Sequence, residues 1–128
     1  AGTGNKVEDF GVGFYTKYGD GGVDLSPIAD LLKSEVYDLG KTLEIPKSIL
    51  TAAPSDGLFG DARTDEDQIG ASYPELEWAM NKAETGKKVD DFEGRERTVF
   101  EIYLCCNAAN KHKMNPIPVC EIPKNLKH

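Results

Sequence analysis

The opening stretch of the sequence, GTGNKVEDFGVGFYTKYGDGG at residues 2–22, concentrates residue types that can bind an anion. Seven of its 21 residues are glycine, and paired glycines around a threonine allow backbone N–H groups to approach a phosphate closely. Lys17, Asp20 and Asp24 then place charges around three further glycines. The spacing alone fits either a phosphate-binding turn or a glycine-rich surface loop with solvated charges.

The charge of the chain limits the classes of ligand. The 128 residues, the length of one ordinary domain, carry a net charge of −7, and acidic side chains outnumber basic ones before residue 97. An acidic chain is a poor general binder of DNA or RNA, whereas a small phosphorylated ligand needs only a few lysines and backbone N–H groups. The apolar runs are short and interrupted. We therefore predict no nucleic acid partner and no membrane span, and we leave nucleotides open.

One long helix should follow the glycine-rich stretch. Residues 24–46 combine Ser26 as an N-cap, Pro27 at the first helical position and Pro46 as the end. Five apolar residues keep helical spacing within it and should be mostly buried, against the remaining sheet, other helices or a partner chain: Ile28, Leu32, Val36, Leu39 and Leu43. A short helical segment is expected around Ile49, followed by a mobile glycine- and aspartate-rich loop.

Two further helices should complete the regular structure. Residues 72–86 predict a helix with Pro74 at its start and Gly86 past its end, and residues 97–113 predict another. The second of these places Val99, Ile102, Tyr103 and Cys106 on one face. Residues 114–128 contain three prolines and should be extended or irregular, and no segment has the pattern of a strand.

The three cysteines lack the spacing of a metal site. Cys105 and Cys106 are adjacent within an apolar stretch, and we interpret both as small buried thiols. Together with Cys120 they make an odd number, which favours a reducing, cytoplasmic protein rather than a disulfide-bonded one.

Several ordered motifs in this chain together resemble NAD synthetase. They are GTGNKVED near the start, GFYTKYGDGGVDLSPIADLLKSEVYDLG after it, Pro54–Ser55, TDEDQIGASY at residues 64–73 and KHKMNPIP at residues 111–118. TKYGDGG followed by a helix that opens with DLSPI is the most specific of them. The resemblance implies a Rossmann-like α/β fold of the ATP pyrophosphatase type, with a five-stranded parallel sheet.

The same resemblance implies that this chain is part of a longer domain. The family carries a phosphate loop of the type SGGxDS in its first half, and no such sequence occurs in these residues. We therefore expect residues 1–128 to be the mostly helical C-terminal portion of a single synthetase domain. We also expect this portion to be inactive by itself.

The reaction that the resemblance implies has two steps. ATP adenylates the nicotinic acid carboxylate of deamido-NAD and releases pyrophosphate, and ammonia then attacks the acyl-adenylate and expels AMP. The parent protein would thus be a carbon–nitrogen ligase, NAD(+) synthase, that uses Mg²⁺, is a homodimer and lies in the cytoplasm.

Matching the family motifs position by position implies roles for eight residues. Thr3, Lys33 and Ser55 match ATP contacts, and Glu8 matches the magnesium ligand. One residue more than in many members separates Glu8 from the Thr–Lys pair, so Asp9 is a possible substitute. The positions that match deamido-NAD contacts are Lys17, Asp24, His112 and Lys113. Without the family, Lys33 would be a solvated helix charge and His112 part of a charge cluster at a helix C-terminus.

Other interpretations stay open at this point. The chain can be a non-catalytic fragment that supplies dimer contacts, with Trp78, Phe100 and Tyr103 at the interface. It can also belong to a glutamine-dependent NAD synthetase, or, less well supported, to an ATP pyrophosphatase that amidates another carboxylate. The acidic loop at Asp56–Asp67 is either a mobile flap or a solvated loop.

Overall fold

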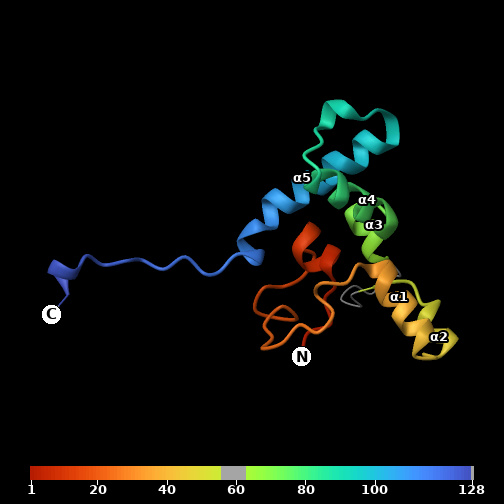
Figure 1. Cartoon of the computed structure of the whole chain (residues 1–128), viewed down its shortest axis with the longest axis horizontal. Coiled ribbons are helices and arrows are strands. Elements are labelled where there is room, and N and C mark those ends of the chain that lie inside the picture. The colour runs from red at the N-terminus through yellow and green to blue at the C-terminus, as the bar shows by residue number, and fades with distance from the viewer. Residues whose placement is uncertain (56–62, 128) are drawn as a thin grey trace.

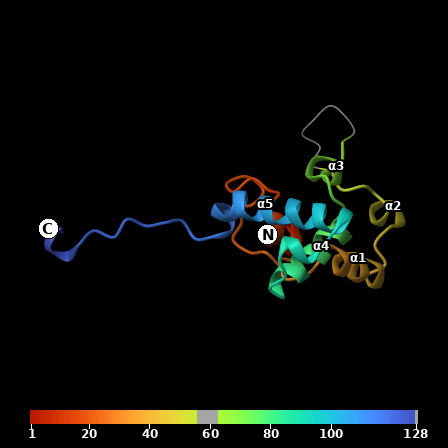
Figure 2. The same cartoon turned by 90° about the horizontal axis from the view of Figure 1, so that it is seen from above.

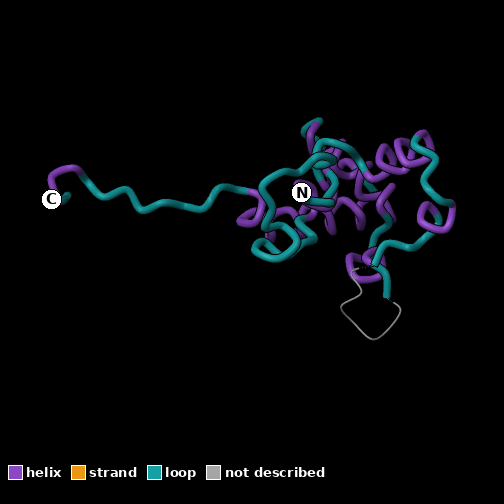
Figure 3. Tube along the Cα trace, turned by 90° about the horizontal axis from the view of Figure 1, so that it is seen from below, coloured by secondary structure: helices purple, strands orange, loops and turns teal. Residues whose placement is uncertain are grey.

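The computed structural model describes residues 1–55 and 63–127, and these residues form helices, turns and loops without a strand (Figures 1 and 3). The mostly helical structure is as expected, whereas the parallel sheet of a Rossmann-like fold is not seen in these residues. The elements in chain order are the π-helix η1 (Val7–Val12), α1 (Lys33–Thr42), α2 (Lys47–Leu50), α3 (Asp65–Ile69), α4 (Tyr73–Glu84), the 3₁₀-helix η2 (Val89–Asp91), α5 (Gly94–Met114) and the 3₁₀-helix η3 (Lys124–Leu126).

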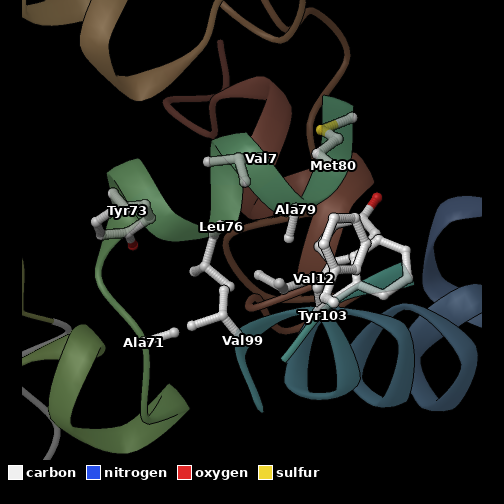
Figure 4. Packing of buried hydrophobic residues seen from close by; sticks show 11 residues of the cluster. Val7, Val12, Ala71, Tyr73, Leu76, Ala79, Met80, Val99 and Tyr103 are labelled. Carbon is white, nitrogen blue, oxygen red and sulfur yellow. The ribbon is translucent and has the colours of Figure 1, made fainter. Parts of the chain in front are cut away.

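The hydrophobic core lies where η1, α4 and α5 meet (Figure 4). Val7 and Val12 of η1 and Leu76 of α4 are each 1% exposed or less. The remaining core residues come mostly from α4 and α5: Ala71, Tyr73, Ala79, Met80, Phe92, Val99, Phe100 and Tyr103. The glycine-rich segment was not expected to contain a helix, yet η1 supplies one side of the core.

The two later helices confirm most of what the sequence predicted. α4 contains Pro74 in its first turn, and the chain leaves it through Gly86 at a φ of 77°. On α5, Val99 and Tyr103 are buried, and Ile102 and Cys106 pack against the core. The expectation for Cys105 is wrong: its side chain is exposed, because it is one residue away from Cys106 and therefore on another side of the helix.

Aromatic residues of α4 and α5 pack within the chain, together with Phe92 at the end of η2. Trp78 lies edge-on to Phe92, with ring centroids 5.0 Å apart, and Phe92 lies 5.0 Å from Phe100. Phe100 is fully buried and Tyr103 is 5% exposed. The interpretation that Phe100 and Tyr103 serve a dimer interface is therefore wrong, because the chain's own core covers them.

The first predicted helix is shorter than the sequence indicated. α1 begins at Lys33, not at Pro27. The Leu31 carbonyl accepts the Lys6 N–H at 2.8 Å, so it is engaged outside the helix instead of accepting an N–H four residues further on. The Glu35 carboxylate also accepts the N–H of the residue before Lys33, at 2.8 Å, and stabilises the later start.

The apolar stripe expected on this helix is not buried within the chain. Leu39 and Leu43 are 43% and 63% exposed, and Ile28, Leu32 and Val36 are half-buried. The core is formed by η1, α4 and α5, and α1 packs at its edge through α4. Within this chain the five residues are therefore only partly covered, and their burial against the remaining sheet or a partner chain stays a prediction.

The two short helices that follow α1 confirm one expectation and correct another. The short helix expected around Ile49 is α2. The acidic segment expected to be a loop forms α3, whose N-cap Thr64 accepts a hydrogen bond from the Asp67 N–H at 3.1 Å. Residues 56–62 of that expected loop lie outside the described residues.

The last part of the chain is irregular, as the prolines indicated. Residues 115–123 contain no regular element and lead away from the helices (Figures 1 and 2). In the part of the chain that the structure describes, no helix is both long enough and apolar enough to cross a membrane.

Glu75 of α4 joins the beginnings of two helices. Its carboxylate accepts hydrogen bonds from Arg95 Nε at 2.7 Å and Nη2 at 2.8 Å in the first turn of α5, and from the Ser72 N–H at 2.8 Å at the start of α4. The Arg95 guanidinium and then the Ser72 N–H lower the pKa of Glu75 from 4.5 to about 2.

We expect Glu75 to contribute stability that is present above about pH 4.5 and is lost as the pH falls towards about 2, because the unfolded chain takes up this proton first. Glu75→Gln keeps an oxygen for Ser72 but loses the charge opposite Arg95. Its melting temperature, followed by circular dichroism, should fall less than that of the wild type between about pH 7 and about pH 3. Glu121→Gln, in the exposed tail, should follow the wild type. Identical pH dependence in Glu75→Gln would contradict the prediction.

Candidate functional site

The structure brings together two residues that lie far apart in the sequence, Glu8 and Lys33. Glu8 lies on η1, and Lys33 is the first residue of α1. Their side chains form an ion pair with 2.6 Å between Lys33 Nζ and Glu8 Oε1, and they are only 20% and 15% exposed. Each charge therefore has the other as its main compensation in a largely buried place.

The local backbone explains how Glu8 reaches this position. Asn5, which is 2% exposed, accepts the Glu8 N–H on its side-chain oxygen at 3.1 Å and so holds the start of η1. The preceding residues run beside the segment that leads into α1: the Gly2 N–H donates to Leu25 and the Lys6 N–H to Leu31. These bonds place η1 next to the first turn of α1.

Thr3 and Glu8 line one small polar cavity of about 70 Å³. Asp9 and Asp20 also line it, so acidic residues make up much of its wall. Burial, and then the charges of Glu8 and Asp20, raise the pKa of Asp9 from 3.8 to about 6. Gly4 lies directly against the Asp9 carboxylate, where a side chain would collide with it. The cavity is thus suited to a cation or to a hydrogen-bond donor.

The carboxylate oxygens of Glu8 and Asp9 can supply only part of the ligand shell that Mg²⁺ needs. Among the described residues, no three carboxylate, histidine or cysteine side chains converge to hold a metal ion by themselves. Mg²⁺ is commonly bound through one or two carboxylates and completes its shell with phosphate oxygens and water. Glu8 fits that pattern, and Asp9 stands next to it at the same cavity.

A second cluster forms at the C-terminal end of α5. Lys17 Nζ donates to the His112 carbonyl at 2.5 Å, and Lys113 Nζ donates to the carbonyls of Gly13 at 2.9 Å and Tyr15 at 2.7 Å. The structure therefore places Lys17, His112 and Lys113 near one another, and their shared role in binding stays a prediction. Two lysines at this end also suit the partial negative charge of the helix C-terminus.

The remaining two implied site residues stand apart from these contacts. Asp24 is exposed in a bend, and no contact seen in the described residues joins it to the Glu8–Lys33 pair or to the α5 cluster. Ser55 is also exposed and directly precedes residues 56–62. The assignments of Asp24 and Ser55 therefore rest on the motifs alone.

Sequence reasoning missed the residues that hold the Lys33 ammonium and those that hold the end of η1. The Tyr73 ring of α4 lies under the Lys33 ammonium, 4.6 Å from its centroid, and the Tyr73 hydroxyl donates to Asp65 at 3.2 Å. Asn107 and Asn110 of α5 donate to the carbonyls of Gly11 and Val12 at 2.7 and 2.9 Å. The sequence signal for Asn107 and Asn110 was two side-chain amides on an otherwise apolar helix face. Such a pattern does not predict which backbone carbonyls they bond to.

Comparison with known proteins gives consistent results. The sequence matches the family model described as NAD synthase over residues 1–116. It is 41% identical over 117 residues to the NH(3)-dependent NAD(+) synthetase of Archaeoglobus fulgidus, covering 91% of this chain and 45% of that relative. The corresponding enzyme of Methanococcoides burtonii is 47% identical over 101 residues, with 79% and 35% covered. The solved structure of an NMN synthetase from Francisella tularensis matches with a TM-score of 0.71 and 34% identity, over 96% of this chain and 45% of that one. The chain thus spans less than half the length of these relatives.

We expect the Glu8–Lys33 pair to be energetically coupled. Glu8→Gln and Lys33→Met each leave a largely buried group without its partner, so each should destabilise the chain, and the double variant should lose less than the sum. The coupling should be about 0.5–3 kcal/mol, as for other contacting pairs. Denaturant unfolding of the wild type and the three variants measures it. The exposed pair Lys41 and Asp38 provides a matched cycle, with smaller coupling expected. Strict additivity for Glu8 and Lys33 would contradict the prediction.

Proposed function

Because the chain belongs to the NAD synthase family, we propose that it forms the C-terminal part of an enzyme that converts deamido-NAD to NAD. In this proposal ATP activates the carboxylate of deamido-NAD, ammonia is the nitrogen donor, and AMP and pyrophosphate are released. The observation that carries the proposal is the meeting of Glu8 and Lys33 beside the Thr3 cavity. The names of the relatives, NH(3)-dependent NAD(+) synthetases, support ammonia over glutamine.

In this proposal Glu8, Lys33 and Thr3 serve ATP. Mg²⁺, with the Glu8 carboxylate as one ligand, would neutralise part of the triphosphate charge. Lys33 would exchange Glu8 for a phosphate oxygen, and its ammonium would stabilise charge that develops during adenylation. The Thr3 hydroxyl, on the same cavity, would donate to the nucleotide. Ser55 is included as an ATP contact on its motif alone.

The α5 cluster would serve the other substrate. Lys17, His112 and Lys113 meet at the end of α5, and His112 is exposed there. We propose that these three residues, with Asp24, bind deamido-NAD. Lys113 already holds backbone carbonyls of the glycine-rich segment, and Lys17 holds the His112 carbonyl, so substrate contacts and the shape of this region would depend on the same side chains.

The longer protein is proposed to be a cytoplasmic homodimer. Cys105, Cys106 and Cys120 are free thiols, which suits a reducing compartment. Exposed apolar side chains such as Leu43 and Ile49 on the α1–α2 side offer a surface for a second subunit or for the rest of the longer protein.

A second candidate function is the synthesis of NMN. It is favoured by one observation, the similarity to the structure named as an NMN synthetase. The two functions differ in the carboxylate that is amidated, a dinucleotide in one and a mononucleotide in the other. Turnover of deamido-NAD and of nicotinate mononucleotide by the longer enzyme, compared at equal concentrations, distinguishes them.

We expect this 128-residue chain alone not to turn over deamido-NAD, and the longer enzyme that contains it to do so. In that enzyme, Glu8→Gln and Lys33→Met should reduce the rate by about 10²–10³, as for other oriented charged contacts to a transition state. Lys33→Met should raise the KM for ATP, whereas Lys17→Met and His112→Ala should raise the KM for deamido-NAD. Steady-state kinetics of the four variants measures this.

The control is Lys124→Met, in the exposed tail, which should behave as the wild type. Wild-type rates in both Glu8→Gln and Lys33→Met would show that the assignments are wrong. Turnover of deamido-NAD by the purified 128-residue chain would contradict the first expectation.

A further inference from the structure

The Lys33 ammonium is held from two sides by groups on different elements. Glu8 of η1 accepts its hydrogen bond at 2.6 Å, and the Tyr73 ring of α4 lies 4.6 Å from it. A cation over an aromatic ring is attracted by the negative face of the ring. This attraction uses none of the three ammonium N–H donors, so the donors remain available for a carboxylate or a phosphate.

Tyr73 is itself fixed at both ends. It is 3% exposed and lies at the start of α4, within the core (Figure 4). Its hydroxyl donates to Asp65 Oδ2 at 3.2 Å, and its N–H donates to Glu66 Oε1 at 2.8 Å, so α3 holds both the ring and the backbone. Burial, together with nearby Glu8 and Asp65, raises the pKa of the Tyr73 hydroxyl, which therefore remains a protonated donor.

The same face of α4 also fixes the backbone that carries Lys33. Glu77 lies four residues after Tyr73, and residues with this spacing are neighbours on one helix face. Its carboxylate accepts the Ser34 N–H at 2.9 Å and the Ser34 hydroxyl at 2.8 Å, in the first turn of α1. α4 therefore sets the start of α1 through Glu77 and the end of the Lys33 side chain through Tyr73.

We propose that Tyr73, anchored by Asp65, is a positioning residue that keeps the Lys33 ammonium in place while Lys33 exchanges Glu8 for the phosphates of ATP. Neither Tyr73 nor Asp65 contacts the phosphates in this proposal, and both act through Lys33. The inference rests on the proposed function, because it takes ATP as the ligand of Lys33. It extends that function to two buried residues for which no role has been assigned.

The test uses the longer enzyme that contains this chain, with Mg²⁺–ATP as the probe. Tyr73→Leu removes the ring and should raise the KM for ATP about tenfold. Asp65→Ala removes the anchor and should raise it about fivefold, whereas Asp65→Asn keeps an oxygen that accepts the hydroxyl and should restore a value near the wild type. The KM for the carboxylate substrate should stay unchanged in all three. Tyr103→Phe, a core tyrosine of α5, is the matched control and should change neither KM.

Each outcome decides the proposal. Equal increases in both KM values, or no rescue by Asp65→Asn, would overturn it, because they indicate general damage to the fold. If Tyr73→Leu does not fold, as judged by circular dichroism, Tyr73→Phe replaces it and should give a smaller increase for ATP only. If the wild type turns over neither deamido-NAD nor nicotinate mononucleotide, the proposed function fails separately. Calorimetric titration with Mg²⁺–ATP then decides, since weaker binding in Tyr73→Phe than in Tyr103→Phe supports positioning and equal binding overturns it.

Discussion

The arrangement of the site depends on how α5 holds the backbone of the glycine-rich segment. Three side chains of α5 donate hydrogen bonds to backbone carbonyls between Phe10 and Tyr15, at and beyond the end of η1. They are Asn107, Asn110 and Lys113. Buried or half-buried carbonyls are costly unless they accept a hydrogen bond. With this backbone fixed against α5, Val7 and Val12 enter the core and Glu8 faces α1.

The Glu8–Lys33 pair compensates the cost of burying two charged side chains. Both side chains are largely buried, and each would be costly alone. A ligand that brings both a cation and an anion can replace each partner by an equivalent charge, so the exchange leaves no buried charge uncompensated. Asp9, beside Glu8, is half-buried, and burial and then the charges of Glu8 and Asp20 raise its pKa.

The sequence allowed prediction of the elements with strong local signals. α4 has Pro74 and Gly86 at its ends, and the apolar face of α5 repeats at helical spacing, so both were found. The start of α1 was misjudged because the Lys6–Leu31 hydrogen bond comes from a distant segment. The motifs named Glu8, Lys33, Lys17, His112 and Lys113, which do gather in two places. Tyr73 and Asp65 were missed because their contacts cross between elements and leave no periodic pattern.

The π-helix η1 sets the spacing between two site residues. In a π-helix the hydrogen bonds span one residue more than in an α-helix, and the Gly13 N–H here bonds to the Glu8 carbonyl. This wider turn lies between Glu8, which meets Lys33, and Lys17, whose ammonium reaches the end of α5. A change of η1 to α-helical pairing would therefore rotate the two side chains relative to one another by about one residue, roughly a third of a turn.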